Sequence, residues 1–239
     1  MLEEAYRLFR RAAQVYRRRE NHKQSALCFT SAASCWSKRC GEKTFYNAAL
    51  SYEEAANEAE KSKDYEYAAL LYKYAAINHE RDGEFLNFSK CFYRSKELYR
   101  KFLTYRLIRP KKIYSIAPPQ AKKKIRGILG CIFSWILLTV SFVVWGHGER
   151  PSRTLFTGIL IVCASAALYI FGSLLAEGIA FMPDFFQALY FSVITFTTVG
   201  YGDIVPVGFS KLVAAIESFS GLFIIPLFII GLSRKYLRM

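Results

Sequence analysis

The first half of this sequence has very little glycine. Only Gly41 and Gly83 occur before residue 127, in a chain that contains 14 glycines. A glycine-rich phosphate loop therefore has no place there, which excludes the common nucleotide-binding regulatory domains. So few helix breakers over so long a stretch favour long helices.

Paired cysteines and a regular row of arginines are also missing. The six cysteines form no Cys-x-x-Cys pair, so we interpret them as buried free thiols in a reducing compartment. Arg100, Arg106 and Arg109 do not recur at every third position of an apolar span, so no voltage sensor is expected. Nor do we expect an enzyme.

An aromatic residue followed three residues later by Ala-Ala recurs through the N-terminal half. Copies begin at Phe9, Phe29, Tyr52 and Tyr72, and a weaker one begins at Phe92. This repeat predicts helical hairpins stacked as an α-solenoid over residues 1–108. The pattern resembles tetratricopeptide repeats and the soluble attachment proteins of vesicle fusion. The resemblance implies a helical fold and a protein or peptide partner for the solenoid.

The second half contains three long apolar stretches, at residues 128–145, about 154–175 and about 212–232. The last two have the roughly 20 residues that a membrane span requires. Between them lies a shorter apolar segment, 185–194, which is long enough to enter a bilayer only partway. Asp184 is the expected N-cap of that short helix.

The loop after the short helix runs from Thr197 to Asp203. Gly200 and Gly202 sit at alternate positions, where the missing Cβ allows left-handed backbone dihedrals. Successive carbonyls can then face one axis and replace the water around a cation. Such backbone is tolerated at membrane depth only when it is buried in protein or lines a water-filled path.

Residues 198–202 (TVGYG) match the selectivity-filter pentapeptide of potassium channels, and residues 150–239 resemble the two-helix potassium channel pore module. The resemblance implies a homotetramer whose K⁺ ions bind in the filter, without an organic cofactor. It assigns the filter residues Thr198, Val199, Gly200, Tyr201 and Gly202. K⁺ contacts the carbonyls of the first four, and the Thr198 hydroxyl completes the innermost site.

Other residues are predicted to support the filter. Thr197 lies beneath it, and Gly202 and Asp203 shape its outer mouth. Tyr190 either braces the loop through Asp203 or serves only in packing. Some prokaryotic relatives carry a carboxylate on the pore helix that pairs with the aspartate, but this chain has Ile194 at that position.

Two residues of the last apolar stretch leave two interpretations each. Gly221 is either a gating hinge, with Pro226 as a second hinge, or a site of close helix packing. Glu217 is the one carboxylate in the stretch. It is either functional, as ionisable groups inside membranes usually are, or hydrogen-bonded behind the pore helix.

The chain carries a net charge of +14, and most of the excess lies before residue 127. Residues 109–126 hold seven basic residues and no acidic one. Next to a membrane segment, such a cluster predicts contact with anionic lipids, whereas nucleic acid is not expected as a partner. The candidates are Lys111, Lys112, Lys122, Lys123, Lys124 and Arg126.

Charge also bears on the topology of residues 128–145. Basic residues precede this stretch, follow it at Arg150 and Arg153, and close the chain at Arg234, Lys235 and Arg238. The positive-inside rule places all these clusters in the cytoplasm. We therefore expect 128–145 to be a re-entrant or interfacial helix, or to pack along the pore without crossing.

The sequence thus predicts an all-α integral membrane protein with a cytoplasmic N-terminal domain and C-terminus. Its expected parts are a helical repeat at 1–108, a basic linker at 109–126, an apolar helix at 127–146 and a pore module at 150–239. The expected function is passive, K⁺-selective conduction regulated through the repeat domain. Two alternatives are a membrane-anchored adaptor with a vestigial pore and a weakly selective cation channel.

Overall fold

The computed structural model describes residues 2–37, 44–109 and 127–237. Contacts within the chain divide it into two compact units, residues up to Phe142 and residues Val143–Leu237. The fold is all-α, as expected, with one small antiparallel sheet in the second unit that the sequence analysis did not predict. The basic candidates for lipid contact, from Lys111 to Arg126, lie outside the described residues.

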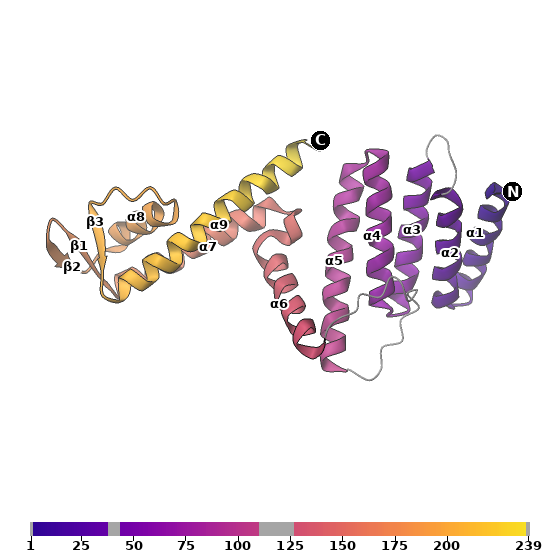
Figure 1. Cartoon of the computed structure of the whole chain (residues 1–239), viewed down its shortest axis with the longest axis horizontal. Helices are drawn as coiled ribbons and strands as arrows, with labels where there is room; N and C mark the ends of the chain where they lie inside the picture. Colours follow the sequence, from indigo (N-terminus) through magenta and orange to yellow (C-terminus); the bar gives the residue numbers. More distant parts are fainter. Residues whose placement is uncertain (1, 38–43, 110–126, 238–239) are drawn as a thin grey trace. The chain divides into compact units, whose positions relative to one another are not determined.

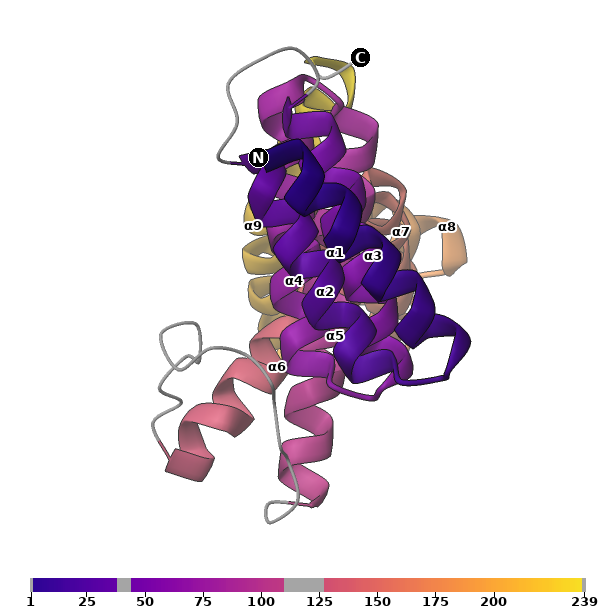
Figure 2. The same cartoon turned by 90° about the vertical axis from the view of Figure 1, so that its right-hand side faces the viewer.

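The first unit begins with five helices that stand side by side (Figure 1). They are α1 (Leu2–Arg18), α2 (His22–Ser37), α3 (Thr44–Lys61), α4 (Tyr65–Asp82) and α5 (Phe85–Ile108). Each helix packs against the next along the chain. Figure 2 looks along this row of helices with α1 in front. An N-terminal helical region is therefore present, as the repeat predicted.

The Ala-Ala pairs explain why the helices pack so closely. Ala32, Ala33, Ala55 and Ala56 are fully buried, and the aromatic residues Phe29 and Tyr52 fill the core between the helices. Phe9 of the first copy is instead exposed. Small residues let the helix backbones approach, while the aromatic side chains supply the buried apolar area.

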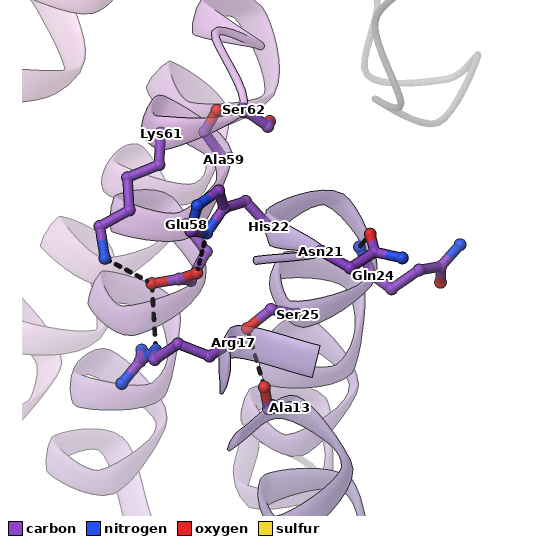
Figure 3. A network of polar contacts seen from close by, with 10 residues as sticks. All are labelled: Ala13, Arg17, Asn21, His22, Gln24, Ser25, Glu58, Ala59, Lys61 and Ser62. Carbon is purple, nitrogen blue, oxygen red and sulfur yellow. Dashed lines mark hydrogen bonds and ion pairs between the residues drawn. The ribbon is translucent and has the colours of Figure 1, made fainter. Parts of the chain in front are cut away.

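A cluster of charged side chains connects α1 and α2 to α3 (Figure 3). The carboxylate of Glu58 is fully buried and pairs with Arg17 Nε at 3.0 Å, His22 Nδ1 at 2.8 Å and Lys61 Nζ at 3.0 Å. Burial alone would raise the pKa of Glu58. The hydrogen bonds from His22 and Lys61 and the positive charges of Arg17 and Lys61 outweigh it, so this pKa lies below its ordinary value.

The helix α6 (Gly127–Trp145) follows, and the one-turn helix η1 (Gly146–Gly148) comes directly after it. We call the second unit, Val143–Leu237, the pore unit. By length and composition, three helices can cross a membrane, at residues 127–148, 151–170 and 209–236. Within the first unit, Trp135 of α6 donates a hydrogen bond to Thr104 of α5 at 2.9 Å. Cys131 is the buried residue of α6, and the others are exposed or partly buried.

The second unit is built on two helices that run side by side, α7 (Pro151–Ile170) and α9 (Phe209–Leu237) (Figure 1). The short helix α8 (Phe185–Phe196) packs against both. The strands β1 (Ser173–Ala176), β2 (Ile179–Phe181) and β3 (Ile204–Val207) pair in the order β2-β1-β3. The last residues of the expected span at 154–175 are therefore strand, because Leu174 and Leu175 pair with both neighbouring strands.

Candidate pore and selectivity filter

The short helix α8 begins where the sequence placed it. Asp184 accepts a hydrogen bond from Gln187 N at 2.7 Å, and the Gln187 side chain accepts one from Asp184 N at 3.1 Å. This reciprocal capping box satisfies two donors at the helix start. The helix spans 12 residues. The negative end of its dipole lies at its C-terminus, next to the loop that follows, and favours a cation there.

The loop after α8 has the alternating backbone expected of a filter. Thr198, Gly200 and Gly202 have positive φ values of 57°, 52° and 80°. Left-handed values are accessible to glycine at little cost, whereas a β-branched residue at Thr198 is held there at roughly 1–2 kcal/mol. The amides of Val199 and Gly200 donate to Ile194 O at 3.0 and 3.3 Å, which ties the loop to the end of α8.

The outer end of the loop is braced by a side-chain contact. The Tyr190 hydroxyl, on α8, donates to Asp203 Oδ2 at 2.8 Å. Ile194 is buried among apolar residues of the second unit. β3 begins directly after Asp203, and its pairing with β1 holds the exit of the loop against the end of α7.

Glu217 lies behind α8, which decides between the two interpretations of its position. Its side chain is 1% exposed and accepts a hydrogen bond from the Tyr169 hydroxyl of α7 at 2.7 Å and a very short one from the Ser192 hydroxyl of α8. The Ser192 hydroxyl also lies 2.8 Å from Val162 O. One carboxylate on α9 thus joins all three helices of the pore unit.

Of the described glycines, Gly221 leaves the least room for an added Cβ atom, because α9 packs against the end of α8 there. A Cβ atom added there would lie 1.9 Å from Phe196 O. The structure therefore gives a packing reason for this glycine, the second of the two interpretations. Pro226 lies inside α9, which continues through both positions to Leu237.

Two side chains of the loop after α8 are largely exposed. Val199 is 53% exposed and Tyr201 is 72% exposed, although both are large apolar groups.

Sequence reasoning placed the loop correctly but missed Tyr169 and Ser192 as partners of Glu217. A lone serine and a lone tyrosine in apolar helices give no signal of their own, so only the folded chain brings them together.

The comparisons with known proteins agree with this geometry. A family model described as an ion channel matches residues 156–237, from α7 to the end of α9. The match indicates an ion channel pore domain in this part of the chain. Neither a curated protein nor a solved structure matches the chain.

Proposed function

We propose that this protein is a K⁺-selective channel. The observation that carries the proposal is the loop after α8, in which positive φ values recur at Thr198, Gly200 and Gly202. This alternation can turn successive carbonyls toward one axis, where they replace the hydration shell of K⁺. The ion ligands are then the carbonyls of Thr198, Val199, Gly200 and Tyr201, and conduction is passive.

Four chains supply the filter in this proposal. A single loop presents carbonyls on one side of an ion only, so a closed ring of copies is required. The exposure of Val199 and Tyr201 leaves both side chains available to neighbouring chains in such an assembly. In the tetramer their side chains pack around the filter and hold its diameter.

The solenoid is proposed to regulate the pore from the cytoplasm. Its link to the pore passes through α6, for which we propose a position that does not cross the membrane. The hydrogen bond between Trp135 of α6 and Thr104 of the solenoid supports this, because a helix held by a soluble domain is not wholly available to the bilayer. The C-terminus then lies on the same side as the solenoid.

A pair of glycine substitutions tests the channel proposal. Gly200 and Gly178 both have positive φ and nothing within 4 Å of an added Cβ, so alanine strains the backbone equally without a clash. Only Gly200 is in the filter; Gly178 lies in the turn between β1 and β2. In liposomes with K⁺ and Na⁺ gradients, we expect selective K⁺ flux from the unmodified protein and Gly178→Ala, and its loss in Gly200→Ala.

Two outcomes would contradict this proposal. Absence of any barium-sensitive K⁺ flux from the unmodified protein would favour the membrane-anchored adaptor. Reversal potentials showing nearly equal Na⁺ and K⁺ permeability would favour a weakly selective cation channel.

Topology is tested separately with a thiol reagent that does not cross membranes. Cys28 is partly exposed on the solenoid, whereas Cys91 is buried and unsuited to the purpose. We expect Cys28 to be protected in sealed cells and labelled once the cells are opened, with Cys28→Ser as the control that assigns the signal. Labelling of Cys28 from outside would overturn the cytoplasmic placement.

A further inference from the structure

Three side chains with metal-binding atoms meet inside the solenoid, far in sequence from the pore. They are Glu53 on α3, His79 on α4 and Cys91 on α5, and their ligand atoms all lie within 4.8 Å of one another. Glu53 Oε1 is 2.5 Å from His79 Nε2 and 3.2 Å from Cys91 Sγ. Three successive helices thus each contribute one ligand atom to one point.

The three groups are buried in a way that suits a metal ion. His79 is fully buried and Cys91 is 4% exposed, while the Glu53 side chain keeps 31% exposure and leaves a path to solvent. Once the thiol has lost its proton, the thiolate and the carboxylate would repel each other, and a divalent cation between them would remove that cost.

The metal-free cluster holds protons where the metal would bind. Burial, and the neighbouring Glu53 carboxylate, raise the pKa of the Cys91 thiol, so it stays protonated and donates to Glu53. Burial alone would raise the pKa of Glu53, but the hydrogen bonds from His79 and Cys91 outweigh it and leave this pKa below its ordinary value.

The His79 imidazole has one ring nitrogen held and one without a partner among the described residues. The Glu53 carboxylate accepts the proton of Nε2 at 2.5 Å, whereas Nδ1 is buried and makes no hydrogen bond to any residue that the structure describes. A metal ion at Nε2 would replace this hydrogen bond, and the ring proton would move to Nδ1. Metal ligands must be deprotonated, so binding by this cluster releases the thiol proton and leaves a neutral imidazole.

We propose that Glu53, His79 and Cys91 form a binding site for a divalent transition-metal ion of the Zn²⁺ class. One sulfur, one imidazole nitrogen and one carboxylate oxygen match the ligands that Zn²⁺ prefers. Three protein ligands leave a fourth position for water, which is typical of exchangeable sites and not of closed structural ones. The proposal is independent of K⁺ conduction by the pore.

Cobalt spectroscopy tests the site on the purified, full-length protein in detergent. The protein is stripped with a chelator and titrated with Co²⁺, and Zn²⁺ is then added in competition. We expect a thiolate-to-cobalt charge-transfer band together with the intense visible bands of tetrahedral cobalt, both removed by Zn²⁺. No measurement of conduction enters this result.

Substitutions assign the ligands. Loss of an outer-sphere partner already weakens metal binding roughly 10–100-fold, so we expect Cys91→Ser to abolish the charge-transfer band and Glu53→Gln to weaken Co²⁺ binding at least tenfold. Cys28→Ser is the matched control and should change nothing, because Cys28 lies outside the cluster. Glu53 is partly exposed, so its substitution is compatible with folding, which circular dichroism checks.

Three results would overturn the site. They are the absence of a thiolate band in the unmodified protein at saturating Co²⁺, a band that survives Cys91→Ser, and unchanged Co²⁺ affinity in a folded Glu53→Gln protein. Any of them would show that the three groups form only a hydrogen-bonded core cluster.

Discussion

Replacing Gly221 by alanine separates the two interpretations of this residue. Real Cβ atoms essentially never come within 3.0 Å of another heavy atom, and an added Cβ would lie 1.9 Å from Phe196 O. The helices α8 and α9 must then move apart by about 1 Å at the point where the filter begins. Overpacking of this kind costs about 1–3 kcal/mol, which exceeds the roughly 1 kcal/mol that alanine gains over glycine in a helix.

We therefore expect Gly221→Ala to lower both the thermal stability of the protein and its K⁺ selectivity. If the strain falls on the filter, about 1.4 kcal/mol corresponds to a tenfold loss of preference for K⁺ over Na⁺. The assay combines thermal unfolding with reversal potentials in liposomes. Gly158→Ala is the matched control, since its Cβ would meet Phe196 Cζ at 3.4 Å, an ordinary contact.

One result would refute the packing argument. If Gly221→Ala keeps the stability and the selectivity of the unmodified protein, α9 does not need a glycine for close approach. A fall in open probability with unchanged selectivity would instead favour the gating hinge. In that case Pro226→Ala, which restores a helix hydrogen-bond donor, should also alter opening.

Three further predictions concern single polar contacts. Tyr190→Phe removes the donor to Asp203 and should make K⁺ currents decay faster in planar bilayers. Glu217→Ala leaves buried hydroxyls unpaired and should cost about 3 kcal/mol of stability, whereas Glu217→Gln should retain most of it; thermal unfolding distinguishes them. Glu58→Gln should cost about 1–3 kcal/mol at pH 7, because the cations around this carboxylate are partly exposed.

The Glu58 prediction also has a pH dependence. The folded-state pKa of Glu58 lies below its ordinary value of 4.5, so its contribution to stability is complete above that value and is lost as the pH falls through the lowered pKa. Glu58→Gln should therefore remove part of the stability loss in acid. Identical unfolding profiles of the two proteins from pH 7 to pH 3 would contradict the Glu58 prediction. An unchanged current decay in Tyr190→Phe would contradict the Tyr190 prediction, and equal stability of the two Glu217 variants would contradict the Glu217 prediction.

Periodic patterns in the sequence were sufficient to predict most elements of the fold. The Ala-Ala repeats located the helices of the solenoid, since small and large residues at a fixed spacing have one good way to pack. The run from Asp184 to Asp203 located a capped short helix and a loop with left-handed glycines, because capping and backbone freedom are local properties of residue types. The strand pairing near Leu174 was missed because one of its two partners, β3, lies beyond the short helix.

The contacts that distinguish a packing residue from a functional one depended on tertiary structure. Glu217 and Gly221 each allowed two interpretations from sequence, and only the positions of Ser192 and Phe196 across the helix interface decided what surrounds them. The cluster of Glu53, His79 and Cys91 was likewise invisible, since its members are separated by 26 and 12 residues and share no motif. Composition and local spacing determine which helices form; the meeting of side chains from different helices is decided only by how those helices pack.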